Sequence, residues 1–447
     1  MPHTNPPSEH KIKAAVLLNR SQTIKSLGEL PQEHPDIAWF NLLNRRIYIL
    51  HKPEYIKQVL QENYQMYHKG LAYDTLKLLL GNGLITSEGD FWKRQRRLVA
   101  PAFHRDKIKG LMQLFHDLTM EQLQKWENQI GKTIDFTREM AQLTINIVCR
   151  AMFGTAISDE QIATVYNNVN KLNEMAIKRI NSVIKLPKWL PTPQMLQMRY
   201  YIRTLDAIVY GIIRQRMASP TQDNDLLNML LNARDEETGE SMSALQLRDE
   251  LMTIFLAGHE TTVNTLSWTW FLLHQHPDAA QCLADEYQQI APPSTMLQPE
   301  HIPQLKYATN VIYETLRLYP AAYLISRESH TVDTMGGFDI PRGTNCLVNI
   351  YGLHRHPKYW EKPHDFMPDR FNTFDQKGDK RFVFLPFGGG PRICVGNNFA
   401  LTEMLVINRL IAQHVSMELV TQQPEPLPQV TLKPRDGIHF RITGVKL

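Results

Sequence analysis

The chain has 447 residues, of which 43% are hydrophobic and 21% are charged, so it can bury a large core and is not disordered, collagen-like or a coiled coil. Lysine and arginine exceed aspartate and glutamate by 49 − 45 = 4 charges, a surplus too small to indicate a nucleic-acid-binding protein. The four cysteines are scattered and form no CxxC pair, which argues against a disulfide framework or structural zinc site and is typical of a reducing compartment.

The N-terminal segment carries no recognisable targeting signal. MPHTNPPSEH is polar, and no later run approaches the roughly 18 apolar residues that a membrane span needs. We therefore expect a soluble, cytoplasmic protein without a transmembrane anchor. Residues 11–30 are expected to form either an ordinary packed first helix or an amphipathic helix that touches a membrane surface.

The remaining elements are mostly helical. Residues 36–50 alternate well enough to predict a β-hairpin, and PEYIKQVLQE predicts a helix with Pro53 in its first turn. Helical periodicity then covers 91–99, 106–130, 138–152, 159–181, 194–217, 244–275, 278–290 and 305–318. No loop is long or flexible enough for a domain linker. The sequence predicts one mainly α domain with a small β-sheet region over residues 1–447, in which 1–34 form an N-terminal extension and first helix.

The segment around residue 95 is densely basic. Trp92 and Arg96 are four residues apart and share one helix face. Other basic residues in this stretch are Lys93, Arg94, Arg97, Arg105, Lys107 and Lys109. Such a patch is either a solvated surface or a docking site for an acidic protein partner.

The apolar helix predicted over 249–275 has an unusual centre, Ala257 to Thr262 (AGHETT). Its glycine and threonines give up about 2 kcal/mol of helix preference. A buried Glu260 must be paired, hydrogen-bonded to water or protonated. The patch is either a kink with a solvent-facing glutamate or a functional site.

Two further patterns lie in the last third. Glu314 and Arg317 share a helix face, as many surface ion pairs do, and PDRF follows at 368–371. In FLPFGGGPRICVG, glycines at 388–390 form a tight loop in which the backbone can approach a flat ligand. Cys394 precedes a helix that begins near Gly396, and both the helix N-terminus and Arg392 lower a cysteine pKa. On this pattern alone, Cys394 is a buried structural residue, a redox-active or nucleophilic thiol, or a metal ligand.

The complete loop matches FxxGxRxCxG at Phe387, Gly390, Arg392, Cys394 and Gly396. It resembles the haem-binding loop of the cytochrome P-450 monooxygenases. The resemblance implies that Cys394 is the axial thiolate ligand of haem b, that Phe387, Gly388 and Gly396 belong to the haem-binding loop, and that Arg392 pairs with a propionate. It also implies the single-domain fold of that family, with haem between the long central helix and the cysteine loop.

Other segments resemble the same family. AGHETT is similar to its oxygen-binding groove, which implies that Ala257 and Gly258 line the haem, Thr261 hydrogen-bonds dioxygen and Glu260 delivers protons. By the same resemblance, the propionates are contacted by Trp92, Arg96 and Arg327. Glu314, Arg317 and Arg370 would form a structural cluster on the haem side.

The implied function is a monomeric haem-thiolate monooxygenase that takes electrons from a ferredoxin and its reductase, or from a flavodoxin, and activates O2. The apolar segments expected to wall the pocket favour a lipophilic substrate that is hydroxylated or epoxidised, such as a fatty acid or a terpenoid. GNGLITSEGDFWKRQRRLVAPAFH and the loop LPKWLPTP resemble most the branch that hydroxylates fatty acids and other long-chain lipids. A peroxide-dependent hydroxylase or isomerase, or a non-catalytic gas sensor, is the alternative, and the Glu260–Thr261 pair disfavours both.

Overall fold

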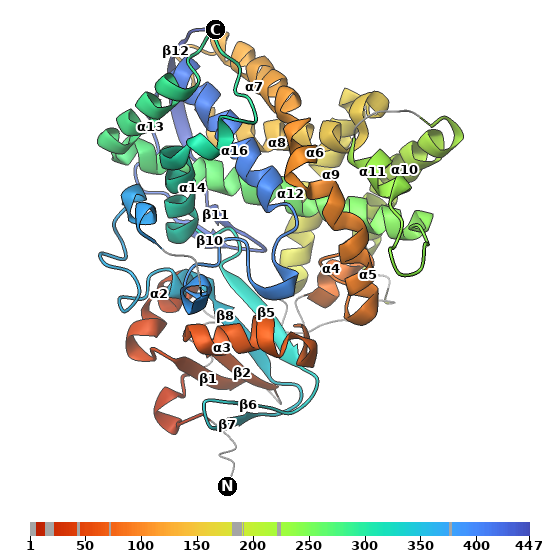
Figure 1. The fold of residues 1–447 in the computed structure, drawn as a ribbon, viewed down its shortest axis with the longest axis vertical. Helices are drawn as coiled ribbons and strands as arrows, with labels where there is room; N and C mark the ends of the chain where they lie inside the picture. Colours follow the sequence, from red (N-terminus) through yellow and green to blue (C-terminus); the bar gives the residue numbers. More distant parts are fainter. Residues whose placement is uncertain are drawn as a thin grey trace.

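The computed structural model describes residues 6–13, 22–42, 45–70, 73–180, 190, 192–220, 225–374 and 378–447. Part of the predicted first helix (14–21) and most of the loop LPKWLPTP (181–189 and 191) lie outside the described residues. The described chain has a sheet-containing end, where the N-terminus lies, and a larger helical part that carries the C-terminus (Figure 1). Within the described residues, no helix is both long enough and apolar enough to span a membrane.

Helices make up most of the fold. They are α2 (Thr23–Glu33), α3 (Pro53–Lys57), α4 (Tyr73–Leu80), α5 (Gly89–Val99), α6 (Arg105–Lys109), α7 (Met112–Glu127), α8 (Phe136–Phe153), α9 (Asp159–Ile180), α10 (Pro193–Ala218), α11 (Leu226–Asn232), α12 (Ala244–Gln275), α13 (Pro277–Ile290), α14 (Lys306–Leu318), α15 (Ile350–Leu353) and α16 (Asn397–His414). The fold class predicted from the sequence, mainly helical with small sheets, is confirmed.

In the described part of the chain, the strands form four small sheets. The largest has the order β1-β2-β8-β5-β3, and the others are β4-β12-β9, β10-β11 and β6-β7. The bounds are β1 (Ile37–Leu42), β2 (Arg45–Leu50), β3 (Tyr67–Lys69), β4 (Thr133–Asp135), β5 (Leu324–Ser329), β6 (Asp333–Met335), β7 (Phe338–Ile340), β8 (Asn345–Asn349), β9 (Val415–Leu419), β10 (Pro426–Pro428), β11 (Leu432–Pro434) and β12 (His439–Val445). β1 and β2 are the antiparallel hairpin predicted over 36–50, with Ile37 opposite Leu50.

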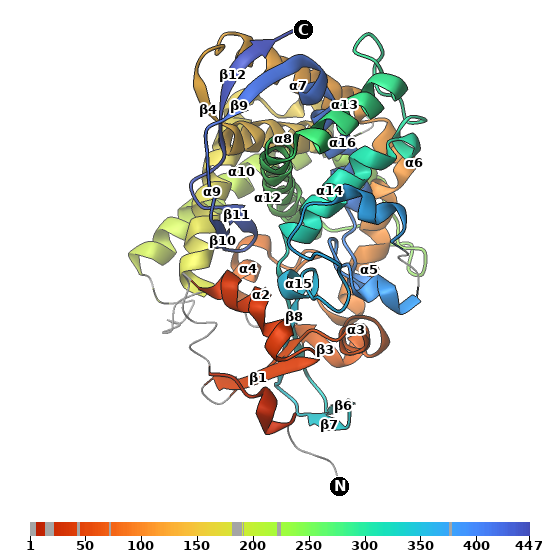
Figure 2. The same ribbon diagram turned by 90° about the vertical axis from the view of Figure 1, so that its left-hand side faces the viewer.

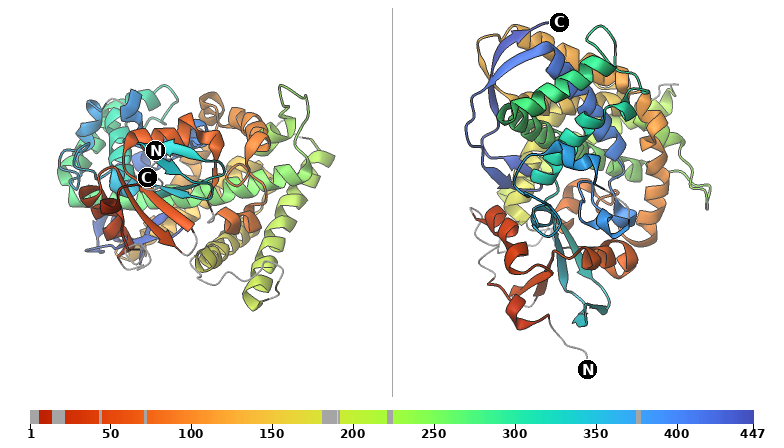
Figure 3. Two further views of the ribbon diagram at one scale, coloured as in Figure 1. Left: turned by 90° about the horizontal axis from the view of Figure 1, so that it is seen from below. Right: turned by 60° about the vertical axis from the view of Figure 1, so that its left-hand side comes forward.

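The long helix α12 lies in the middle of the helical part, with α8, α14 and α16 around it (Figures 1 and 2). A capping box begins the helix: the Ser243 hydroxyl accepts from the Gln246 backbone, and the Gln246 side chain accepts from the Ser243 backbone. α9 and α10 pack side by side and project from one flank (Figure 3). A central helix covered on several sides is expected to be apolar all round, and most of α12 is buried.

One predicted helix is wrong. The stretch 106–130 is divided into α6, which ends at Lys109, and α7, which begins at Met112. Glycine is a weak helix former, and Gly110 lies at the break between the two helices. The short helices α4 and α11 were not predicted, because eight and seven residues are too few for a periodic pattern to be distinctive.

Candidate active site

The loop before α16 is a tight turn built on glycines. Gly388 and Gly390 have φ of 74° and 68°, a conformation that favours glycine. A Cβ on Gly390 would lie 1.9 Å from the carbonyl oxygen of Leu60, so no other residue fits there. The Cys394 N–H donates to the Phe387 carbonyl at 2.9 Å, which closes the loop. The helix α16 then begins at Asn397, as predicted. Cys394 therefore lies at the end of a fixed turn, just before this helix.

The Cys394 side chain is exposed, although protein surrounds it on most sides. Burial raises the pKa of its thiol, while the Gly396 backbone N–H and Arg96 act in the opposite direction. The sequence interpretation that Arg392 would help to lower this pKa is wrong. Arg96 is the cation beside the thiol, because its Nη1 donates to the adjacent Ile393 carbonyl at 2.8 Å.

The centre of α12 has a stripe that is not buried. Ile254, Ala257, Gly258 and Thr261 are half-buried, whereas most neighbouring residues of the helix are buried. Their spacing of i, i+3, i+4 and i+7 puts them on one face. We call this face the open stripe. Because α8, α14 and α16 pack on other parts of α12, the open stripe is the part of its centre that remains accessible and where a substrate or cofactor could lie.

The threonines of this segment donate back into the helix. Thr261 Oγ1 donates to the Ala257 carbonyl at 2.8 Å, and Thr262 Oγ1 donates to the Gly258 carbonyl at 3.2 Å. α12 is helical without interruption here. A Cβ on Gly258 would lie 3.1 Å from the side chain of Val148 of α8, a tight contact that favours glycine at this position.

Two side-chain hydrogen bonds join α12 to α16. Thr262 Oγ1 lies 3.3 Å from Glu403 Oε2, and Trp270 Nε1 donates to Asn408 Oδ1 at 3.0 Å. The residue numbers of the bonded partners increase in the same order along α12 and α16, so the two helices run in the same general direction. Towards the N-terminus, the open stripe precedes Thr262 on α12, and Cys394 precedes Glu403 and the start of α16. The two segments singled out from the sequence therefore lie against the same region.

Glu260 is held by protein groups from two distant segments. Asn173 Nδ2 of α9 donates to its Oε2, and Thr431 Oγ1, which follows β10, donates to its Oε1, both at 2.9 Å. Asn264 Nδ2 donates in turn to Thr431 Oγ1 at 2.9 Å. The carboxylate beside the open stripe is thus oriented by neutral donors, and it is not the solvent-facing glutamate of the alternative interpretation.

Several cations gather around the start of α5. The Arg392 guanidinium lies 4.2 Å from the centre of the Trp92 ring and pairs with Glu88. Arg327 is buried, and its Nη1 donates to the Ser326 carbonyl at 2.9 Å. Trp92, Arg327 and Arg392, all predicted from the sequence, therefore belong to one region, and Arg96 lies one helical turn beyond Trp92.

Lys69 of β3 also belongs to this region and was missed. Burial, followed by Arg327 and Arg392, lowers the pKa of Lys69 well below its usual value, and Glu88 opposes them. Burial likewise lowers the pKa of Arg392 to about 10. Four basic side chains with Glu88 as the nearby carboxylate leave a positive surplus, which fits a ligand with anionic groups. The sequence offered no signal for Lys69, which only the pairing of β3 with β5 brings to Arg327.

The predicted cluster of Glu314, Arg317 and Arg370 is present. Arg317 donates from Nε and Nη2 to both oxygens of Glu314, at 2.7 and 2.8 Å, and the side chains of both residues are 0% exposed. Arg370 Nε donates to Glu314 Oε1 at 3.0 Å. Arg317 also binds the carbonyl groups of His354, Pro363 and Asp365. The cluster therefore fixes the chain that leads to the cysteine loop.

His354 connects this cluster to the loop and gives the fold a pH dependence. The Leu385 N–H donates to His354 Nε2 at 2.9 Å, and burial lowers the pKa of His354 to about 3. An unfolded histidine has a pKa near 6.5, so below that pH the unfolded chain binds a proton that the folded protein excludes. We expect the free energy of unfolding to fall by about 2 kcal/mol between pH 7 and pH 5 through this residue alone. Urea unfolding at both pH values should show that His354→Gln loses that much less than the wild type; equal losses would contradict this account.

The predicted docking patch is largely neutralised. Arg97 pairs with Asp235 and Glu237 at 3.0 and 2.8 Å, and Arg94 pairs with Glu240 at 3.2 Å. Lys93 pairs with Asp90, and Lys109 pairs with Asp106. The loop before α12 thus supplies acidic partners from about 140 residues away. These ion pairs reduce the free positive charge of the stretch, and the choice between a solvated surface and a docking site stays open.

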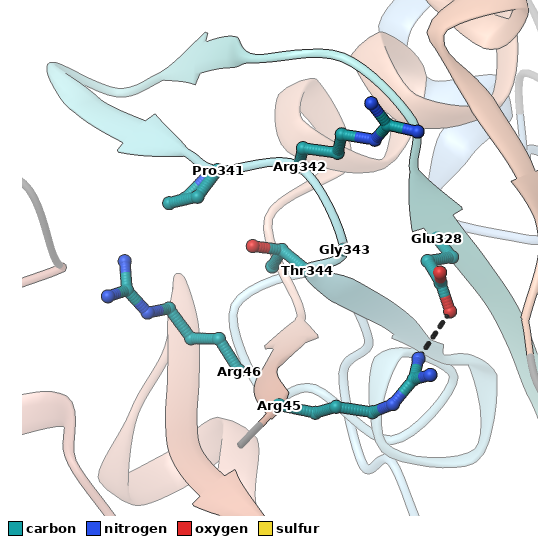
Figure 4. A pocket seen from close by; sticks show the side chains of 7 residues that line it. All are labelled: Arg45, Arg46, Glu328, Pro341, Arg342, Gly343 and Thr344. Atoms are coloured by element: carbon teal, nitrogen blue, oxygen red, sulfur yellow. Dashed lines mark hydrogen bonds and ion pairs between the residues drawn. The ribbon is translucent and has the colours of Figure 1, made fainter.

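A separate surface pocket of about 450 Å³ lies beside the five-stranded sheet. Figure 4 shows its lining residues, Arg45, Arg46, Glu328, Pro341, Arg342, Gly343 and Thr344. Arg45 and Glu328 form a partly exposed ion pair at 2.9 Å. The pocket contains none of the residues singled out for catalysis, so the region between α12 and the cysteine loop is the stronger candidate.

Comparison with known proteins shows the family to which the chain is similar. The family model described as Cytochrome P450 matches residues 6–440. Cyclooctatin synthase of Streptomyces melanosporofaciens is 32% identical over 97% of this chain and 92% of its own length. Cyclooctat-9-en-7-ol 5-monooxygenase of the same organism is 32% identical over 92% of this chain and 86% of its own. Protein LUTEIN DEFICIENT 5 of Arabidopsis thaliana is 27% identical over 88% of this chain and 70% of its own.

Proposed function

Because the chain belongs to the cytochrome P450 family and is a P450 monooxygenase, we propose that it hydroxylates or epoxidises a lipophilic terpenoid or fatty acid, with Cys394 as the thiolate ligand of its haem b. The single observation that carries the assignment of the site is the position of Cys394. It is accessible at the end of a glycine turn, and the hydrogen bonds between α12 and α16 support its placement near the part of α12 that carries Glu260 and Thr261.

The residues of the site fit the cofactor of this family, haem b. Its two carboxylates match the positive surplus of Lys69, Arg96, Arg327 and Arg392, and Trp92 packs under Arg392. The glycine turn leaves the backbone free of side chains where a flat ring must approach. When bound, haem with a thiolate ligand supplies the activation of dioxygen, because the anionic sulfur donates electron density to the iron.

The chain itself supplies orientation and protons. Asn173 and Thr431 hold the Glu260 carboxylate beside the open stripe, where it would receive protons from water and pass them into the cavity. The Thr261 hydroxyl, one residue further, would hold a proton at Oγ1 next to the reacting molecule. Buried apolar side chains of α12 exclude water from the remaining wall.

The electron donor is proposed to be a ferredoxin with its reductase, or a flavodoxin, that docks on a single-domain monomer. Arg105 and Lys107 remain as exposed cations between α5 and α7, since the neighbouring basic residues are engaged in ion pairs. Electrostatic steering by so small a patch is expected to be weak.

The name of one of the relatives supports an alcohol of lipophilic character as substrate. This relative is a monooxygenase named for cyclooctat-9-en-7-ol, an unsaturated alcohol. The resemblance of LPKWLPTP to the fatty-acid branch falls mostly on residues outside the described part, so it adds no structural support.

A ligand panel tests the substrate class. Purified haem-loaded protein is titrated with cyclic terpenoid alcohols, terpene hydrocarbons and long-chain fatty acids, and the change of haem spin state is followed by absorption. We expect terpenoids to give the largest changes, because a rigid apolar ligand displaces cavity water at a small entropic cost. A response to none of the three classes would contradict the proposal.

A further inference from the structure

Residues 81–88 connect α4 to α5 and are fixed at both ends; we call this segment the strap. Within the strap, Thr86 Oγ1 donates to the Gly81 carbonyl at 2.8 Å, and the N–H groups of Thr86 and Ser87 donate to the Gly83 carbonyl at 2.9 Å. The strap is therefore a compact turn that moves as one piece, and its position depends on what holds it.

Its first end rests on two carboxylates of α12. The Asn82 N–H donates to Asp249 Oδ2 at 2.7 Å, and the Leu84 N–H donates to Glu250 Oε2 at 3.0 Å. The approach is so close that a Cβ on Gly81 would lie 2.2 Å from Asp249 Oδ1. Gly81 has a φ of 60°, so glycine is required there on both counts.

Its second end rests on the cysteine loop. Arg392 Nη1 donates to the Ser87 carbonyl at 3.1 Å, and Arg392 also pairs with Glu88. The strap therefore bridges the two segments that enclose the proposed site, α12 on one side and the loop of Cys394 on the other.

Glu250 places the strap against the open stripe. Residues 250, 254, 257 and 261 share one face of α12, since they are separated by four, three and four positions. About 10 Å of helix separates Glu250 from Ala257, at 1.5 Å per residue. Leu84 and Ile85, which Glu250 holds through Leu84, are half-buried apolar residues that would form the end wall of the cavity.

We propose that Glu250 is a specificity-determining positioning residue: its hydrogen bond to Leu84 sets the end wall of the substrate cavity and so decides which lipophilic ligands fit between the strap and the cysteine loop. This inference rests on the proposed function, because it takes the space along the open stripe to be the substrate cavity.

The side chain of Glu250 is suited to this single task. It is 1% exposed, and among the described residues the Leu84 N–H is its only partner, since Oε1 has none. Burial raises the pKa of Glu250 to about 8, so the carboxyl group is mostly neutral at pH 7. A glutamine can then replace it with the same shape and the same acceptor, whereas alanine removes the acceptor.

The test compares three variants of the haem-loaded protein by peptide-level hydrogen exchange and by spin-state titration with the ligand panel. Glu250→Ala should speed exchange in residues 82–88 about tenfold or more and change the ratio of dissociation constants for a bulky and a slender terpenoid about threefold or more. Glu250→Gln should restore both to within twofold of the wild type.

Glu286→Ala is the matched control. Glu286 of α13 likewise holds backbone N–H groups, those of Tyr307 at 2.7 Å and Ala308 at 2.8 Å, but it caps α14. It should speed exchange at the start of α14 and leave the strap and the ligand ratio unchanged.

Unchanged exchange of the strap in Glu250→Ala would overturn the proposal, and so would an unchanged ligand ratio despite faster exchange. A wild type that binds nothing in the panel would contradict the proposed substrate class instead, and the exchange data would still decide whether Glu250 holds the strap.

Discussion

Thr261→Ala should leave haem binding and reductant consumption intact but divert most of the reductant to hydrogen peroxide. The Thr261 hydroxyl is the polar group of the open stripe, and it lies next to Glu260. Without it, a proton can no longer be held at that position, and general acid catalysis of this kind is worth about 10²–10⁴-fold. We expect product per reductant to fall about tenfold or more, measured as product and peroxide formed per NAD(P)H oxidised.

Thr265→Ala is the appropriate control for Thr261. Thr265 Oγ1 also donates to the carbonyl four residues earlier, that of Thr261, at 2.8 Å. Thr265 is only 2% exposed, however, and does not belong to the open stripe. It should keep wild-type coupling. Full coupling in Thr261→Ala, or equal losses in both variants, would contradict the role proposed for Thr261.

Glu314→Ala should strongly destabilise the folded, haem-loaded protein and lower its yield. The substitution leaves the fully buried Arg317 without its carboxylate partner and also removes the acceptor of Arg370 and of the Met367 N–H. Breaking a buried ion pair by removing one partner costs about 3–5 kcal/mol, a large part of the roughly 5–15 kcal/mol that stabilises a domain. The free energy of unfolding, from urea denaturation, should fall by at least 3 kcal/mol.

Glu418→Ala tests whether burial is the cause. Glu418 pairs with Arg441 at 2.9 Å, but both side chains are more than half exposed. Its loss should cost about 1 kcal/mol or less, because water screens such pairs. A similar loss of stability in both variants would show that burial of the Glu314 cluster is not what matters.

The sequence predicted those parts of the site whose residues lie close together along the chain. The glycine loop, Cys394 and the helix that follows lie within a dozen residues, so turn chemistry and spacing are enough to define them. The hairpin of β1 and β2 and the pair of Glu314 and Arg317 are local in the same sense, and the structure contains all of them.

Contacts between distant segments could not be predicted in this way. Asn173 and Thr431 meet at Glu260 although 258 positions separate them, and neither belongs to a recognisable motif. The acidic partners of the basic stretch near residue 95, Asp235 and Glu240, could not be predicted for the same reason, because they precede another helix. Packing, rather than local preference, decides which charges remain free.

The absorption spectrum of the reduced, carbon-monoxide-bound protein tests the central claim most directly. If Cys394 is the thiolate ligand of haem, the wild type should give the strongly red-shifted band of a haem-thiolate complex, and Cys394→Ala should lose that band. A wild-type spectrum of the imidazole-ligated kind, or an unchanged band in Cys394→Ala, would contradict the account of the site given above.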